Sequence, residues 1–317
     1  MAVSIEDSYP ANRTFWPGFA ALLGGALAMG ISPIFVRLSD VGPFASAFYR
    51  VFLALPVLYA WMRLEQRNGR IAAPVRGFSP AVVATALAFT GDLLVWHLAI
   101  LNTSIANSTF FATTAPVWVG LIGWIALGRR VAPMTVIGLF FCLLGGGALV
   151  WQSLALSPDH LVGDFYAGLT AVFFGIYFLT VEWARRTEGA ATITFRMSLI
   201  TAALLAVVAL GAHLFYGQRL FPSDAAGWLV LICLATISHA GGQGLLSYAL
   251  GSLPSMFSSL VIFLEALAAA ALAWTILGEA VSPLQGLGGI AILFGIWLAR
   301  PRAKQPTPGS VASTADA

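Results

Sequence analysis

The chain has 317 residues, of which 59% are hydrophobic and only 9% are charged. Soluble domains average about 25% charged residues, so an apolar excess over the whole length indicates that lipid surrounds most of the chain. This composition excludes a cytosolic enzyme with a hydrophobic tail, a nucleic-acid-binding protein and a secreted disulfide scaffold. A net charge of +3 is too small for a surface that follows phosphates. Cys142 and Cys233 both lie inside apolar runs, which argues against a disulfide.

Apolar runs of transmembrane length follow one another along the chain. A helix needs about 20 mainly apolar residues to cross the hydrocarbon core, and Pro, Gly and Arg separate the runs. Their expected bounds are 16–38, 45–62, 79–101, 104–127, 132–151, 163–184, 191–215, 225–248, 254–277 and 284–300. We therefore expect an all-α integral membrane protein with ten transmembrane helices. Only a polar stretch from Asn102 to Asn107 separates the third and fourth runs, so one long buried helix is the alternative there.

The segments outside these runs are short. Residues 1–15 are expected to form a cytoplasmic N-terminal segment, and the first run lacks the cleavage site of a removable signal peptide. Residues 152–162 are expected to form an external connecting loop. Residues 301–317 are rich in Pro, Ser, Thr and Ala, and we expect a disordered cytoplasmic tail there. No connection is long enough for a soluble domain.

The basic residues predict the orientation of the chain. If the N-terminus is cytoplasmic, most arginines fall in cytoplasmic turns, and only Arg37 and Arg219 fall in external ones. That asymmetry follows the positive-inside rule. We therefore expect a multi-pass protein of the inner (plasma) membrane with both termini in the cytoplasm.

The chain contains an internal repeat. A shift of 150 residues places 124–145 over 274–295 without a gap, and a shift of 146 pairs Arg50 with Arg196. The matched pairs of the gap-free segment are Trp124/Trp274, Leu127/Leu277, Gly128/Gly278, Val131/Val281, Pro133/Pro283, Gly138/Gly288, Leu143/Leu293 and Gly145/Gly295. Self-similarity of this kind indicates repeated structural units. We therefore expect two five-helix repeats, 16–151 and 163–300.

Five helices per repeat is an odd number, so the second repeat must cross the membrane in the opposite direction. The charges agree, because the turn with Arg129 and Arg130 is basic and its counterpart contains Glu279. Inverted repeats are typical of secondary transporters, in which the repeats exchange conformations to give inward-open and outward-open states. The pattern therefore predicts transport by alternating access.

Two segments resemble a known family. They read LAILNTSIANSTFFATTAPVWVGLIGWIALGRRVAP in the first repeat and YALGSLPSMFSSLVIFLEALAAAALAWTILGEAVSP in the second. They are similar to the EamA domains of the drug/metabolite transporter superfamily, and the resemblance covers about residues 16–300. The chain departs from the family pattern at Arg129, where Glu is usual, and at Glu265–Ala266, where Glu-Pro is common. The resemblance implies a ten-helix transporter, most like exporters of amino acids and related metabolites.

Polar side chains inside the runs are candidates for function because they are unfavourable in hydrocarbon. The eighth run carries His239, Gln243 and Ser247 at i, i+4 and i+8, on one helical face, and the related face of the third run ends at His97. We expect these side chains to hydrogen-bond a bound solute. The alternative is hydrogen bonding between helices. Trp96 is expected either to form an aromatic wall beside His97 or to face lipid.

Three further side chains are candidates for the substrate path. Tyr177 lies mid-span on a polar-aromatic face of the sixth run, a pattern that suits a cavity wall but that packing also produces. Glu265 lies midway along the ninth run, where burial disfavours a charged carboxylate. Glu265 and Asp92 are therefore candidates for proton coupling or for binding a substrate ammonium group. The alternative for both is a structural hydrogen bond to a neighbouring helix.

Two other features favour structural roles. Arg50 and Arg196 occupy equivalent positions in the two repeats, which favours a shared role such as snorkelling or pairing with helix-end carbonyl groups. Glycines recur seven residues apart in the fifth and tenth runs, which predicts close packing of these helices away from the substrate path.

These features predict a secondary active or facilitative transporter that exports small metabolites, including aromatic or apolar amino acids, across the inner membrane. A proton-coupled multidrug efflux carrier that depends on Glu265 is the first alternative. A passive channel is another, and a membrane-embedded enzyme is the alternative of another class, although motifs such as H-E-x-x-H are missing from the sequence. We expect a monomer without cofactor, metal or nucleic-acid partner, whose partners are its substrate and membrane lipid.

The inverted repeat makes a prediction about topology. Single tags placed in the turn at Arg129 and in the turn at Glu279 should be reached from opposite faces of the membrane, because five helices separate each turn from its counterpart. Labelling with a membrane-impermeant reagent, in intact and in permeabilised cells, measures this. Labelling of both turns from the same face would contradict the inversion.

Overall fold

The computed structural model describes residues 15–68, 77–151, 161–268, 271 and 282–301. Within these ranges the elements are helices, and no strand occurs. The expectations for the N-terminal segment, the external loop, the C-terminal tail and the Glu279 turn fall on 1–14, 152–160, 302–317 and 272–281, which lie outside the described residues.

Ten helical crossings form the bundle. In the described part of the chain, eight helices are long and apolar enough to span a membrane, and two shorter apolar helices follow, Ser255–Ala268 and Pro283–Ala299. The eight are Phe15–Leu38, Pro43–Arg67, Pro80–Asn102, Asn107–Leu127, Pro133–Val150, Leu161–Ala184, Ala190–Tyr216 and Ala225–Ala249. The all-α membrane fold predicted from the sequence is therefore confirmed, with the spans in the expected order.

Proline interrupts three of the crossings. They consist of α1 (Phe15–Gly30) with α2 (Ser32–Leu38), α3 (Pro43–Phe52) with α4 (Leu55–Arg67), and α6 (Ile105–Thr113) with α7 (Ala115–Leu127). Pro33, Pro56 and Pro116 stand at the first or second position of α2, α4 and α7. Because proline has no N–H to donate and clashes with the preceding turn, it begins a helix readily but interrupts one that is already running.

A polar break separates the third crossing from the fourth. α5 (Pro80–Asn102) ends before Thr103, and the side chain of Ser104 then caps α6 by accepting a hydrogen bond from the Asn107 N–H at 3.0 Å. Such a cap satisfies an N–H group that has no partner inside the new helix. The alternative of one long helix across these two runs is therefore wrong.

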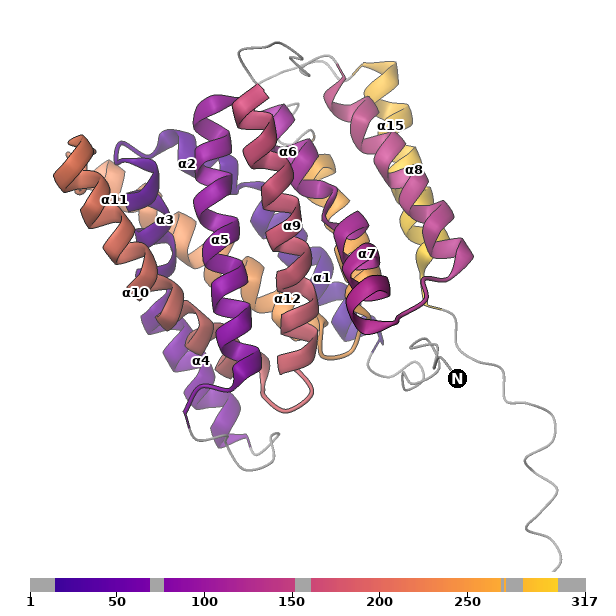
Figure 1. The fold of residues 1–317 in the computed structure, drawn as a ribbon, viewed down its shortest axis with the longest axis horizontal. Coiled ribbons are helices and arrows are strands. Elements are labelled where there is room, and N and C mark those ends of the chain that lie inside the picture. The colour runs from indigo at the N-terminus through magenta and orange to yellow at the C-terminus, as the bar shows by residue number, and fades with distance from the viewer. Residues whose placement is uncertain (1–14, 69–76, 152–160, 269–270, 272–281, 302–317) are drawn as a thin grey trace, which may run out of the picture.

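The fifth and tenth crossings pack as an antiparallel pair. α8 (Pro133–Val150) and α15 (Pro283–Ala299) lie side by side at one edge of the bundle (Figure 1). Gly138 faces Gly295, and Gly145 faces Gly288. Residue numbers rise along one helix as they fall along the other, so the equivalent fifth helices of the two repeats run in opposite directions. The predicted inversion of the repeats is therefore confirmed.

The first and third helices of the repeats pack reciprocally. α5 packs along α9 (Leu161–Ala184), the first helix of the second repeat (Figure 1). The eighth crossing packs along α1 in the same way, and it consists of α11 (Ala225–Cys233), the π-helix η3 (Leu234–Gln243) and α12 (Gly244–Ala249). α10 (Ala190–Tyr216) packs along α3 and α4, and α13 (Ser255–Val261) contacts α7. The seam between the repeats therefore runs through the middle of the bundle.

The glycine contacts make a prediction about stability. Gly288→Ala is expected to destabilise the protein by about 1–3 kcal/mol through overpacking, because a Cβ there would lie 2.7 Å from the Gly145 carbonyl oxygen. Gly286→Ala is the matched control on the same helix, since a Cβ at Gly286 meets nothing within 4 Å and alanine favours a helix. Thermal unfolding of both purified variants in detergent measures the difference. Equal midpoints would contradict close packing of α8 on α15.

Candidate functional site

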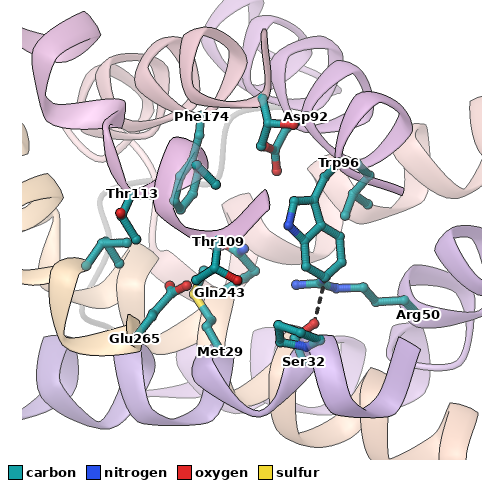
Figure 2. Close-up of a pocket in the computed structure, with 15 residues that line it drawn as sticks. Met29, Ser32, Arg50, Asp92, Trp96, Thr109, Thr113, Phe174, Gln243 and Glu265 are labelled. Atoms are coloured by element: carbon teal, nitrogen blue, oxygen red, sulfur yellow. Dashed lines mark hydrogen bonds between the residues drawn. The ribbon is translucent and has the colours of Figure 1, made fainter. Parts of the chain in front are cut away.

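A cavity of about 50 Å³ lies inside the bundle and is lined by both repeats. The first repeat contributes Met29, Ser32, Pro33, Arg50, Asp92, Leu93, Trp96, Thr109, Ala112 and Thr113, and the second contributes Thr170, Phe174, Gln243, Ile262 and Glu265. Figure 2 shows the labelled side chains around a common space. Charged, hydroxyl, amide, aromatic and aliphatic groups therefore meet at the seam between the repeats.

Interrupted helices form much of the cavity wall. Ser32 and Pro33 begin α2 directly after the break in the first crossing, and Thr113 ends α6 at its junction with α7. In the second repeat, Gln243 ends η3 and Ile262 follows the end of α13. Regular helical hydrogen bonding stops at such breaks, and π segments often mark functional sites. Discontinuous helices near the middle of the membrane are a recurrent way of building substrate sites in secondary transporters.

Arg50 is the guanidinium group of the cavity wall. It comes from α3 and is only 4% exposed. One N–H donates to Ser32 Oγ at 3.1 Å, and the guanidinium carbon lies 5.6 Å from the centre of the Trp96 ring. Its Nε is buried without a hydrogen-bond partner among the described residues, and none of the three ion pairs found there involves Arg50. The guanidinium group is therefore held in position while at least its Nε–H has no acceptor among the described residues.

Two carboxyl groups line the same cavity. Asp92 lies on α5, one turn before Trp96, and Glu265 lies in the helical segment Ser255–Ala268 of the second repeat. The Glu265 Oε1 atom is buried without a hydrogen-bond partner among the described residues. No hydrogen bond or ion pair of Asp92 occurs within that part of the chain either. Both carboxyl groups are therefore available to a bound molecule.

Carboxylates near the helix ends differ from Asp92 and Glu265, because they form hydrogen bonds or ion pairs that join the two repeats. Three do so at the end of the bundle where α1 begins and α4 ends, which we name the N-terminal end. The contacts are Glu65 with the N–H groups of Ala191 and Thr192 (3.2 and 3.1 Å), Glu188 with Ser79 Oγ (2.6 Å), and Glu182 with Arg129 (2.9 Å). Each contact pairs a residue of one repeat with a residue of the other.

Two further carboxylates join the repeats at the opposite end, which we name the distal end. Asp164 accepts hydrogen bonds from Thr103 Oγ1 at 2.7 Å and from Asn107 Nδ2 at 2.9 Å. Asp40 accepts hydrogen bonds from the Ser223 hydroxyl and, at 2.7 Å, from the Ser223 N–H. These two hydrogen bonds hold the pKa of Asp40 below its ordinary value. Asp92 and Glu265 therefore stand apart from the carboxylates that hold the repeats together.

Arg50 and Arg196 have different surroundings although they occupy equivalent positions. Arg196 forms an ion pair with Glu188 at 2.7 Å and does not line the cavity. The shift that superposes the two arginines places Gly42 at the position of Glu188, so the first repeat has no carboxylate there. Arg50 instead reaches the cavity. The expectation of a shared structural role for the two arginines is therefore wrong.

Four of the predicted site residues line the cavity: Trp96, Gln243, Asp92 and Glu265. Gln243 is only 1% exposed, and its Oε1 has no hydrogen-bond partner among the described residues. Trp96 faces Arg50 and does not face lipid. These four side chains come from α5, η3 and the ninth crossing, so the seam brings together residues that lie far apart in the sequence.

The other four predicted residues, His97, Tyr177, His239 and Ser247, are fully buried but lie outside the cavity wall. Their contacts are with the bundle itself: His97 Nδ1 with the Leu93 carbonyl (2.7 Å), His239 Nε2 with Ser198 Oγ (2.8 Å), Ser247 Oγ with the Ala190 carbonyl (3.5 Å), and the Tyr177 ring with those of Phe89 and Phe174. In this conformation the structure therefore places them behind the wall.

The expected polar face of the eighth crossing is divided by its π-helix. His239 lies within η3 and points to α10, whereas Gln243 ends η3 and lines the cavity. The i, i+4, i+8 spacing assumed a regular α-helix, and i→i+5 bonding changes the register of side chains around the axis. His239 and Gln243 therefore do not share one surface.

The sequence interpretation did not single out Ser32, Thr109 and Thr113, which also line the cavity. A signal was present for Ser32, because Pro33 predicts a helix break beside it. The difference between Glu188 and Gly42 was a second signal, since it leaves Arg50 without the ion pair of its counterpart.

Removing the charge of a carboxylate that joins the repeats should affect stability more than removing that of a carboxyl group in the cavity wall. Glu188→Gln is expected to destabilise the protein by about 1–3 kcal/mol, because it weakens contacts to Ser79 and Arg196 at 2.6 and 2.7 Å. Asp92→Asn should cost less than about 1 kcal/mol or stabilise the protein, because a buried carboxyl group without a partner is itself unfavourable. Thermal unfolding in detergent compares them. A larger loss for Asp92→Asn would show that Asp92 is a structural group.

Comparison with known proteins agrees with this architecture. The model of the EamA-like transporter family matches residues 16–150 and 161–300. Two relatives from Archaeoglobus fulgidus, each described as an uncharacterized transporter, are 26% identical over 284 residues (89% of this chain and 96% of the relative) and 24% identical over 279 residues (86% and 93%). A crystal structure that is 20% identical superposes with a TM-score of 0.71 and covers 90% of this chain and 95% of its own, which shows a common fold. The chain therefore belongs to the EamA-like transporter family, within the drug/metabolite transporter superfamily.

Proposed function

We propose that this multi-pass membrane transporter exports small metabolites, including aromatic or apolar amino acids, across the inner membrane by alternating access. The observation that carries the proposal is the cavity at the seam of the inverted repeats, with charged groups and apolar side chains in one wall. A solute that crosses by this route is held by both repeats at once. Movement of one repeat against the other then changes which side of the membrane it faces.

The size of the cavity supports a change of conformation during transport. Ligand pockets usually measure about 300–1,000 Å³, whereas this cavity is about 50 Å³. That space holds a few water molecules and is too small for an amino acid with an aromatic side chain. The described conformation is therefore a contracted one, and a substrate must enter through a state in which the repeats have separated.

The contacts between the repeats support gates at the two ends. Glu65, Glu182 and Glu188 join the repeats at the N-terminal end, and Asp40 and Asp164 join them at the distal end. Opening one end requires the contacts there to separate while those at the other end persist. Hydrogen bonds and ion pairs of this kind each contribute only about 0.5–3 kcal/mol net, so a small number of them can separate and re-form as a gate opens and closes.

The wall of the cavity supports an amphipathic solute. Phe174 and Trp96 offer rings, Met29 and Ile262 offer aliphatic surface, and Arg50 belongs to the same wall. A sugar would use few of the apolar groups, and an alkane would leave the polar groups unpaired. An apolar amino acid uses both kinds of surface.

A proton-coupled multidrug carrier is the second candidate function. It is favoured by Glu265, whose Oε1 is buried without a partner among the described residues. A carboxyl group in this position can exchange a proton for a cationic solute. Because both functions use the same cavity, transport measurements must separate them.

Counterflow in proteoliposomes tests the proposal. Vesicles loaded with unlabelled L-phenylalanine or L-leucine should accumulate the labelled amino acid faster than protein-free vesicles, because a carrier exchanges solute molecules one for one and a pore does not. Equal uptake with and without internal amino acid would indicate a pore.

Glu265→Gln separates the two candidate functions. If the protein is a proton-coupled drug carrier, a pH gradient should drive ethidium transport by the wild type, and the variant should lose it. Gradient-driven ethidium transport without amino-acid counterflow would overturn the amino-acid proposal.

A further inference from the structure

We propose that Arg50 and Glu265 form the two poles of a site for zwitterions, in which Arg50 binds the carboxylate of an α-amino acid and Glu265 binds its ammonium group. The proposal rests on the transport function proposed above and specifies how the same cavity selects its substrate. It implies that a solute lacking either charged group is a poor substrate.

The surroundings of Arg50 fit an anion subsite. Ser32 holds one guanidinium nitrogen at 3.1 Å and the Trp96 ring lies 5.6 Å from the guanidinium carbon, so two neighbours fix the side chain. Nε is buried and has no hydrogen-bond partner among the described residues. A planar guanidinium group with free donors binds a carboxylate through two parallel hydrogen bonds. A buried cation is unfavourable without such a partner.

Glu265 fits an ammonium subsite on the other side of the cavity. Figure 2 shows Glu265 and Arg50 entering the space from opposite sides. The buried Oε1 atom of Glu265 and the buried Oε1 atom of Gln243 both lack hydrogen-bond partners in the described structure. An ammonium group has three N–H donors and no acceptor, so it is satisfied by a set of acceptors of this kind.

The placement of the two carboxyl groups favours Glu265 over Asp92 as the ammonium partner. Asp92 lies one turn from Trp96 on α5, and Trp96 packs against Arg50. Asp92 is therefore on the Arg50 side of the cavity. Glu265 comes from the second repeat and is the carboxyl group that remains. A zwitterion offers a carboxylate to Arg50 and an ammonium group to Glu265, so each of the two poles gains a partner of opposite charge.

Apolar groups in the same wall suit the side chain of the amino acid once the repeats have separated enough to admit it. Met29, Trp96, Phe174 and Ile262 line the cavity together with the two charged groups. Burial of an apolar side chain against them contributes favourably to binding. The α-amino and α-carboxyl groups then define the position of the solute, and the apolar wall tolerates different side chains.

Inhibition of L-phenylalanine counterflow by two analogues tests the site in proteoliposomes. Phenethylamine lacks the carboxylate and 3-phenylpropionate lacks the ammonium group. Each should inhibit the wild type about 10- to 100-fold more weakly than phenylalanine, because one buried pole stays unpaired. Arg50→Gln should abolish the preference over phenethylamine. Glu265→Gln should abolish the preference over 3-phenylpropionate.

Arg196→Gln and Glu182→Gln are the matched controls. Both residues are ion-paired outside the cavity, so these variants should keep the wild-type selectivity even if they are less stable. If Arg50→Gln does not yield folded protein, Arg50→Lys replaces it. Lysine retains the charge without the planar fork, so phenylalanine should inhibit more weakly while inhibition by phenethylamine is unchanged.

The outcomes distinguish this proposal from the function on which it rests. Absence of counterflow for every amino acid tested would overturn the proposed function. The zwitterion site alone would be overturned if amino-acid counterflow occurs but the variants keep the wild-type preference for phenylalanine. The relevant preference is over phenethylamine in the Arg50 variants and over 3-phenylpropionate in Glu265→Gln. If leucine is the better substrate, isoamylamine and 4-methylpentanoate serve as the matched analogues.

Discussion

The structure depends on the constraint that polar groups inside a bilayer must find partners within the protein. This chain meets the constraint with few charged residues, and it places most of its described carboxylates near helix ends. There Asp40, Glu65, Asp164, Glu182 and Glu188 bind donors of the opposite repeat. The polar contacts that close the two ends of the bundle are therefore also the contacts that hold the repeats together. In the described middle of the bundle, Asp92 and Glu265 are carboxyl groups without such partners.

The inverted repeat supplies the scaffold, and departures from its symmetry supply the site. The glycine contacts of α8 with α15 follow the repeat closely, since Gly138 and Gly145 face Gly295 and Gly288. The arginines do not, because Glu188 neutralises Arg196 whereas the corresponding position in the first repeat is glycine. One duplicated arginine has thus become part of an ion pair, and the other has become part of the cavity wall. A site on a symmetry axis favours one orientation of an asymmetric solute only if the two halves differ.

Helix interruptions connect the scaffold to the site. The breaks at the start of α2 and between α6 and α7, and the change from π-helix to α-helix at the end of η3, all lie beside residues that line the cavity. A continuous helix uses its backbone groups internally, so it offers a solute only its side chains. Interrupted helices also bend at defined points, and such helices recur around the substrate sites of secondary transporters.

The sequence by itself determined the ten crossings, their order and the inversion of the repeats. Each crossing follows from the length of one apolar run, and the inversion follows from counting five runs in each repeat. It also indicated Asp92 and Glu265, since a carboxyl group in an apolar run stands out without a structure. Only the tertiary structure decided which polar side chains share a surface. His239 and Gln243 are four residues apart, yet the π-helix turns one towards Ser198 and the other towards the cavity. Arg50 lines the cavity whereas Arg196 pairs with Glu188, and the glycine at the position equivalent to Glu188 acquires meaning only when the two repeats are folded against each other.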